Sequence, residues 1–244
     1  MNDIKWLVQI TEGVLNILYP HTCPICGRIP KVDRAEVCPE CKKKIKYIEE
    51  PSCKKCGKQL LAEEQEYCYD CSKREHIYTR GLALWVYGDE IRKSIYNFKY
   101  NNKREYARVY ANEIVLRHRR KIESWNADAL IPIPIHQSKM RSRGFNQAED
   151  LCRELSKQLG VPVLSDCIKR EKKTLPQKGL NDKQRIKNLK KAFKTMNNDV
   201  ELKRVILVDD IYTTGATINS VAELLENMGV YEIYFITISI GEGI

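Results

Sequence analysis

Eight of the ten cysteines occur in four Cys-x-x-Cys pairs, which begin at residues 23, 38, 53 and 68. Two cysteines separated by two residues can direct both sulfurs at one metal ion, and two such pairs complete a tetrahedral four-thiolate site. The spacing therefore predicts two structural zinc ions. Pairing in order gives one site from Cys23, Cys26, Cys38 and Cys41 and another from Cys53, Cys56, Cys68 and Cys71; a cross-braced pairing is the alternative.

Other uses of these cysteines fit less well. A cytosolic chain keeps its thiols reduced, which argues against disulfides, and a redox-active pair normally occurs once, beside a strand–helix–strand unit. Four thiolates per ion leave no coordination position for a water molecule, so hydrolysis at these ions is not expected. The cysteine repeat is therefore predicted to be a scaffold or a docking surface, and Cys152 and Cys167, outside the repeat, are predicted to be buried apolar residues.

A second chemical motif lies in residues 205–217. Four apolar residues predict a buried strand, and two acids follow at its carboxyl end. A hydroxyl-rich turn then leads into a predicted helix, whose free N–H groups and positive dipole end can hold a phosphate. The carboxylates lie where vicinal ribose hydroxyls need acceptors. The sequence predicts a ribose-phosphate site with Asp209 and Asp210 as catalytic candidates, and with Tyr212, Thr213, Thr214, Gly215, Ala216 and Thr217 as further binding residues.

These residues also have a plainer interpretation, in which the two acids only cap a helix that follows a strand. The segment is neither a Walker loop, since no Gly-Lys-[Ser/Thr] sequence occurs, nor a Gly-x-Gly-x-x-Gly dinucleotide motif. Upstream, Ile131-Pro132-Ile133-Pro134 predicts a rigid turn at the end of a strand. The basic residues that follow this turn can clamp a polyphosphate; they are His136, Lys139, Arg141 and Arg143.

Alternating strand and helix patterns must position these motifs. Strands are predicted over 81–88, 128–133, 205–208 and 232–238, and helices over 90–99, 103–122, 145–159 and 216–228. This order predicts an α/β fold with a doubly wound, mostly parallel sheet. Residues 4–18 predict an amphipathic helix that docks on the protein, with membrane contact as the alternative. Two domains are expected, 1–78 with this helix and the cysteine repeat, and 79–244.

Composition limits the partners. The chain has 244 residues and a formal net charge of +10, and residues 169–194 hold eleven Lys or Arg residues against Glu171 and Asp182. This local basicity suits an anionic ligand or a nucleic acid, while a solvated lysine-rich surface is the alternative. There is no stretch of about 18 uncharged apolar residues. The N-terminus also lacks the order of a signal peptide, so a cytoplasmic protein without a membrane span is expected.

Residues 205–217 resemble the fingerprint of type I phosphoribosyltransferases, whose two acids hold the ribose hydroxyls of phosphoribosyl pyrophosphate and whose next loop binds the 5-phosphate. With the four cysteine pairs, Lys99-Tyr100, the Ile131–Pro134 turn and Arg143-Gly144-Phe145-Asn146-Gln147, nearly the whole chain resembles the ComF family of competence proteins. The resemblance implies a double zinc ribbon before a type I phosphoribosyltransferase-like domain, a role in natural transformation, and Mg²⁺ bound with phosphoribosyl pyrophosphate. It also implies that the N–H groups of Ile133 and Ile135 contact the pyrophosphate.

Three functions are compatible with this resemblance. The first is a phosphoribosyltransferase of unknown acceptor that acts in DNA uptake, with Lys169, Arg170, Lys172 and Lys173 in a loop that closes over the leaving pyrophosphate. The second is a non-catalytic competence factor. Its zinc ribbons would dock a DNA-translocating helicase, at the inner face of the membrane, and single-stranded DNA would contact the same basic loop together with Lys190 and Lys191. The third, a nucleobase salvage phosphoribosyltransferase, gives the cysteine repeat no role.

Overall fold

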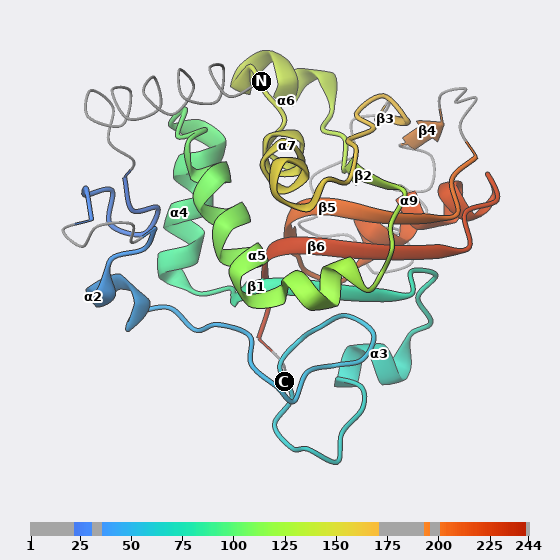
Figure 1. Cartoon of the computed structure of the whole chain (residues 1–244), viewed down its shortest axis with the longest axis horizontal. Helices are drawn as coiled ribbons and strands as arrows, with labels where there is room; N and C mark the ends of the chain where they lie inside the picture. Colours follow the sequence, from blue (N-terminus) through green and yellow to red (C-terminus); the bar gives the residue numbers. More distant parts are fainter. Residues whose placement is uncertain (1–21, 31–35, 171–192, 196–200, 243–244) are drawn as a thin grey trace, which may run out of the picture.

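A sheet of four parallel strands forms the centre of the computed structural model, which describes residues 22–30, 36–170, 193–195 and 201–242. The strands are β1 (Arg80–Val86), β2 (Ala129–Pro132), β5 (Arg204–Tyr212) and β6 (Glu232–Ile240), in the order β1-β6-β5-β2 (Figure 1). The predicted helix over residues 4–18 lies outside the described residues, as do Lys172, Lys173, Lys190 and Lys191.

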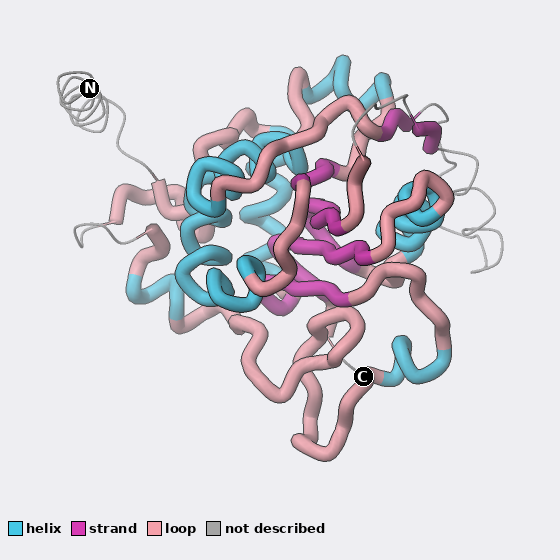
Figure 2. The backbone as a smooth tube through the Cα atoms, turned by 45° about the vertical axis from the view of Figure 1, so that its right-hand side comes forward, coloured by secondary structure: helices cyan, strands magenta, loops and turns pink. Residues whose placement is uncertain are grey.

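Helices cover both faces of this sheet (Figure 2). Alternate residues of β5 divide between two hydrophobic clusters. Ile206 and Val208 pack with α4 (Asp89–Tyr100), α5 (Tyr106–Glu123) and α7 (Gln147–Leu159), whereas Val205 and Leu207 pack with α9 (Ala216–Glu226). The strands are apolar almost throughout because neither face meets water. The structure therefore confirms the predicted doubly wound parallel α/β fold.

Three elements outside the cysteine repeat were not expected from the sequence. The short basic helix α6 (Gln137–Arg143) is capped by His136, whose ring accepts a hydrogen bond from the Ser138 N–H, and by Gly144 with φ 79°. The strand β3 (Ile168–Arg170) pairs antiparallel with β4 (Phe193–Thr195), apart from the main sheet.

The predicted burial of Cys152 and Cys167 is confirmed. Among the described helices, none combines the length and the apolar character that crossing a membrane requires.

The cysteine repeat wraps around the β1 edge of the sheet. Residues 46–48 run antiparallel to β1, where the Ile48 N–H donates to the Leu84 carbonyl (3.1 Å) and the Val86 N–H donates to the Lys46 carbonyl (2.9 Å). The backbone of β1 is thereby shielded from pairing with other strands. The first four cysteines join the cluster under α4 and α5, and the last four join the cluster under α9.

The cysteine repeat therefore packs against both faces of one sheet. Its short helices are α2 (Pro39–Lys42) and α3 (Tyr69–Lys73), one in each half of the repeat. The boundary predicted between residues 78 and 79 falls just before β1. Because the segments on either side of it share both hydrophobic clusters, we propose this boundary as a division of the sequence and not as a division into independently folding parts.

Candidate functional site

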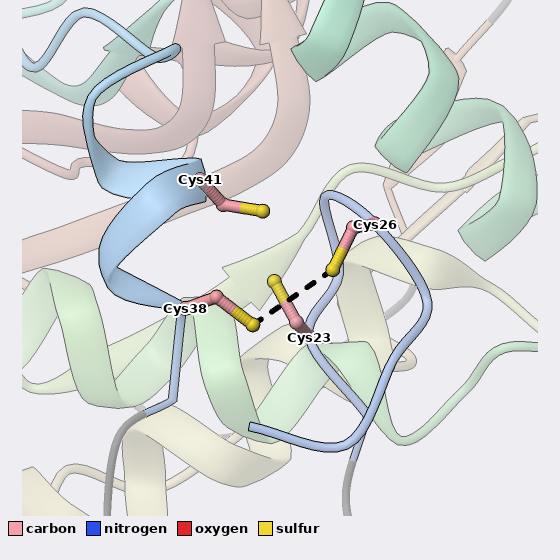
Figure 3. Close-up of side chains that lie close together, drawn as sticks. All are labelled: Cys23, Cys26, Cys38 and Cys41. Atoms are coloured by element: carbon pink, nitrogen blue, oxygen red, sulfur yellow. Dashed lines mark hydrogen bonds between the residues drawn. The ribbon is translucent and has the colours of Figure 1, made fainter. Parts of the chain in front are cut away.

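The cysteines of the repeat form two clusters of four sulfurs. Cys23, Cys26, Cys38 and Cys41 make one, and Cys53, Cys56, Cys68 and Cys71 the other, with all sulfurs of a cluster within 4.8 Å of one another. The Sγ atoms of Cys26 and Cys38 are 3.8 Å apart (Figure 3), and those of Cys56 and Cys68 are 3.6 Å apart. Tetrahedral Zn–S bonds of about 2.3 Å place sulfurs about 3.8 Å apart. Both clusters fit structural zinc, and the pairs combine in order, so the cross-braced alternative is wrong.

The local backbone explains how each cluster forms. Cys38 and Cys68 are the N-cap residues of α2 and α3, so the second pair of each site lies across one helical turn. Burial acts to raise the pKa of Cys26, but hydrogen bonds from Arg28 outweigh it and lower the pKa to about 6, which favours the thiolate that metals bind. Gly57, with φ 76°, approaches β1 so closely that a Cβ atom would lie 2.7 Å from the Gly81 carbonyl oxygen.

The two acids of the ribose-phosphate motif lie at the carboxyl edge of the sheet. The sequence predicts a strand that ends at Val208, but β5 continues to Tyr212 because Asp209 pairs with Thr237 of β6. On its other side, β2 stops at Pro132, which pairs with Val208. The acids therefore begin one residue beyond the end of β2, where a ligand can reach them.

The carboxyl groups of Asp209 and Asp210 have opposite electrostatic environments. The Asp210 N–H donates to Asp209 Oδ1 at 2.8 Å. Burial raises the pKa of Asp209 well above its ordinary value, and the charge of Asp210 adds to this effect. Burial also acts to raise the pKa of Asp210, but the ion pair with Lys99 outweighs it and lowers the pKa. Lys99 thus keeps Asp210 ionised. Asp209 favours its neutral form until a cation or a hydroxyl donor binds beside it.

Lys99 is a candidate site residue that was not predicted from the sequence. The Lys99-Tyr100 pair contributes to the family resemblance, but no signal in the sequence shows that α4 ends beside Asp210. Lys99 belongs to a group of cations. Burial lowers the pKa of Lys139, and repulsion from Arg143, Arg170 and Lys99 lowers it further. Positive side chains crowded in this way provide a site for a polyphosphate.

The predicted basic residues differ in their placement. Arg143 donates to the Tyr100 hydroxyl (2.8 Å) and to Gln147 Oε1 (3.0 Å), and its guanidinium lies 4.6 Å from the Tyr100 ring centroid. Arg141 is exposed on α6, and His136 caps that helix. Lys169 is exposed on β3. Arg170 is half-buried; burial lowers its pKa, and the charge of Asp209 opposes that effect.

The loop after β5 leaves the start of α9 open. Gly215 is the N-cap of α9 with φ 74°, and no side chain caps this helix. The N–H groups of the first turn, at Ala216 and Thr217, are therefore available to a phosphate. Thr213 is exposed and Thr214 is half-buried, so both hydroxyls lie near the surface of this loop.

Two predicted ligand contacts need correction. The Tyr212 side chain is 4% exposed and stacks on Phe235 (ring centroids 4.9 Å apart). It therefore packs in the core against β6 and does not face a ligand. The Ile133 N–H donates to the Val208 carbonyl (2.9 Å), and its carbonyl accepts from Asn146 Nδ2 (3.1 Å). Both backbone groups of Ile133 are thus in use. Ile135 makes no hydrogen bond through its N–H within the described residues, and it remains the backbone candidate for pyrophosphate.

Comparison with known proteins agrees with this geometry. The double zinc ribbon domain model matches residues 14–72, and the phosphoribosyl transferase domain model matches residues 140–239. Competence protein F of Haemophilus influenzae is 36% identical over 166 residues, which cover 66% of this chain and 72% of that protein. The chain belongs to the ComF family.

Other relatives are less similar to this chain. DNA utilization protein YhgH of Shigella flexneri is 32% identical over 59% of this chain and 64% of that protein. Competence protein ComFC of Bacillus subtilis is 28% identical over 60% of this chain and 58% of that protein. The chain thus spans about three fifths of the length of these two relatives. The comparisons and the sheet together establish a phosphoribosyltransferase-like fold joined to a double zinc ribbon.

Proposed function

We propose that the protein binds phosphoribosyl pyrophosphate with Mg²⁺ at the carboxyl end of β5 and acts in DNA uptake, as the names of its relatives suggest. The observation that carries this proposal is the position of the acid pair. Asp210 forms an ion pair with Lys99, a member of the group of cations around Lys139, and the uncapped start of α9 follows the acid pair along the chain. A ligand with phosphates at both ends of a diol matches this order of charges.

Each part of the ligand has a matching group. The carboxylates of Asp209 and Asp210 would accept hydrogen bonds from the ribose 2- and 3-hydroxyls and contribute to the shell of Mg²⁺, which prefers carboxylate and phosphate oxygens. The N–H groups at the start of α9 would hold the 5-phosphate, with the hydroxyls of Thr213, Thr214 and Thr217 as further donors. Lys139, Arg143 and the Ile135 N–H would hold the pyrophosphate.

A transferase reaction follows from this placement. The bond between ribose C1 and the pyrophosphate oxygen would break as a nucleophile of the acceptor bonds to C1, and the electron pair of the broken bond would leave with pyrophosphate. Mg²⁺ would supply charge neutralisation on the leaving group. Lys99, Lys139 and Arg143 would stabilise the same charge, and the acids would stabilise the positive charge that develops on the sugar ring. The acceptor would approach C1 from the face opposite the pyrophosphate.

Calorimetry tests this proposal. The zinc-loaded protein with Mg²⁺ is expected to bind phosphoribosyl pyrophosphate, to bind ribose 5-phosphate or pyrophosphate alone more weakly, and to lose the first interaction in Asp209→Asn/Asp210→Asn. Asp89→Asn is the control, because Asp89 is an exposed acid in the first turn of α4, at the opposite end of that helix from Lys99. Unchanged binding in the double variant would show that the ribose assignment is wrong.

A second candidate function is single-stranded DNA binding without turnover. It is favoured by two exposed basic side chains, Arg141 on α6 and Lys169 on β3. Phosphate contacts make affinity fall log-linearly with salt, so Arg141→Ala/Lys169→Ala should weaken binding and reduce the salt slope. A DNA-translocating helicase docked on the zinc ribbons would complete this role, in the cytoplasm and at the inner face of the membrane. The nucleobase salvage alternative would instead require turnover with a free base.

A further inference from the structure

The second four-cysteine site is connected to the ribose-phosphate loop by two consecutive residues. Six residues after Cys71, the Ile77 N–H donates to Asn219 Oδ1 in the first turns of α9 (2.9 Å). The next residue, Tyr78, forms a hydroxyl-to-hydroxyl hydrogen bond with Tyr212 (2.6 Å), at the end of β5. The segment from Ile77 to Tyr78 therefore holds the chain on both sides of the loop formed by residues 213–217.

The contact between the two tyrosines is buried. Tyr78 is 0% exposed and Tyr212 4% exposed. The ring of Tyr78 meets the Phe235 ring edge-on (4.9 Å), and the Tyr212 ring stacks on that same phenyl ring at an interplanar angle of 3°. Burial raises the pKa of both hydroxyls, so both stay neutral and one donates to the other. A buried hydroxyl that loses this partner has no water to replace it.

Tyr212 in turn sets the backbone of the loop. A Cβ atom on Gly215 would lie 2.8 Å from Tyr212 Cζ, so the glycine backbone rests directly on the tyrosine ring. Gly215 also accepts, through its carbonyl, from the Asn219 N–H (2.8 Å) as the first hydrogen bond of α9. The position of the ring therefore determines where the open N–H groups of α9 point.

The segment before Tyr78 leads back to the second cysteine cluster. Cys53, Cys56 and Cys68 share a hydrophobic cluster with Tyr78 and Tyr212. Just after Tyr78, the Thr79 N–H donates to the Ile233 carbonyl (2.6 Å), and the Thr79 hydroxyl accepts from the Ile233 N–H (3.1 Å). The segment is thus fixed between the cysteine cluster and β6.

We propose that Ile77 and Tyr78 form a clamp, through which the folded second zinc ribbon holds the 213–217 loop in the conformation that binds the 5-phosphate. This inference takes its ligand from the proposed function. The expected effect on the conformation of the loop does not depend on that ligand. Tyr78 is a positioning residue, because it acts on the ligand site only through Tyr212. The first ribbon has no equivalent role, since it packs on the opposite face of the sheet.

Tyr78→Phe tests the clamp with a matched control. The variant keeps the ring and removes the hydroxyl. Tyr47→Phe removes a different hydroxyl of the cysteine repeat. That hydroxyl donates to Glu113 Oε2 (2.9 Å) on α5. Amide exchange across residues 213–219 is expected to rise about tenfold in Tyr78→Phe and to stay unchanged in Tyr47→Phe. Affinity for phosphoribosyl pyrophosphate with Mg²⁺ should fall about tenfold in the first variant only.

Zinc removal at one site at a time gives a second comparison. Cys71 and Cys26 are the half-exposed members of their clusters, so Cys71→Ser and Cys26→Ser are matched. Only Cys71→Ser should speed exchange in the loop. Equal exchange in Tyr78→Phe and wild type overturns the clamp. If wild type does not bind phosphoribosyl pyrophosphate but Tyr78→Phe still loosens the loop, the proposed function is wrong and the clamp stands.

Discussion

Lys99 of α4 forms an ion pair with Asp210 of β5, and their side chains are only 19% and 15% exposed. Two adjacent carboxyl groups therefore differ in their preferred charge before any ligand binds, because Lys99 stabilises one ion while burial disfavours the other. Substitutions at the two acids should consequently have opposite effects on the free energy of unfolding.

Replacing Lys99 by Met should destabilise the protein by about 1–3 kcal/mol, since a largely buried carboxylate loses its partner. The folded pKa of Asp210 is lowered, so the pair contributes stability above the unfolded pKa of 3.8 that would be lost only as pH falls through the folded value. Urea unfolding should therefore show a constant difference from wild type between about pH 6 and pH 8. A difference that disappears in this range would contradict the pairing.

Replacing Asp209 by Asn should stabilise the protein without ligand, by about 1 kcal/mol or more at neutral pH. The folded pKa of Asp209 is raised above 3.8, so its favourable contribution exists at low pH and is lost as pH rises through the folded value. Asn retains the oxygen that accepts from the Asp210 N–H. The gain should therefore grow with pH in the same urea experiment, while binding of phosphoribosyl pyrophosphate is lost. A gain that does not depend on pH would refute the raised pKa.

Removal of both zinc ions together should unfold the sheet as well as the ribbons, because the two cysteine clusters belong to the two hydrophobic clusters that cover its faces. Structural zinc provides an apparent binding free energy of about 10–16 kcal/mol in small zinc domains. A strong chelator should release two zinc ions per chain, with loss of near-ultraviolet circular dichroism from buried residues such as Trp85. Cys167→Ala should retain both ions, whereas Cys53→Ser should retain one. Release of zinc without loss of the aromatic signal would contradict this coupling.

Replacing Ile48 by Pro should expose the edge of β1. The variant loses the N–H that donates to the Leu84 carbonyl, at a cost of about 1–3 kcal/mol. Unpaired strand edges also promote association, so light scattering should rise with protein concentration. Ile48→Ala keeps the N–H and loses only the side chain. Association in both variants would assign the effect to lost apolar contacts and not to the strand edge.

Replacing Gly215 by Ala should cost about 1–3 kcal/mol and weaken phosphate binding. Two effects combine here: φ is 74°, and a Cβ atom would strike the ring of Tyr212. Gly160→Ala is the matched control, because Gly160 ends α7 with φ 72° and open space at its Cβ position. Thermal unfolding should show the larger loss for Gly215→Ala, and equal losses would mean that the ring contact is unimportant.

Patterns within the chain predicted much of this molecule. The cysteine period identified both metal sites because a four-thiolate cluster needs only local knuckles. The parallel sheet was predicted because its strands, such as Val205–Val208, are buried on both faces and read as unbroken apolar runs. The acid pair was found because it directly follows a strand, which the neighbouring residues of the sequence show.

Contacts between distant segments were not predicted. Lys99 meets Asp210, and Tyr78 meets Tyr212, through packing that no spacing in the sequence encodes. The end of β5 was misplaced because pairing with β6 extends the strand through polar residues. The Ile133 amide was assigned to pyrophosphate because its hydrogen bond to Val208 depends on the neighbouring strand. Helix α6 was missed because its basic residues carry no apolar periodicity.

The order of the strands has a consequence for synthesis of the chain. β6 follows β1, β2 and β5 along the chain, yet it lies between β1 and β5. β1 must therefore stay unpaired on its inner side until β6 has left the ribosome. The cysteine pairs precede β1 and can capture their ions during that interval. A cell short of zinc would accumulate nascent chains in which the cysteine repeat is still unfolded when β6 emerges.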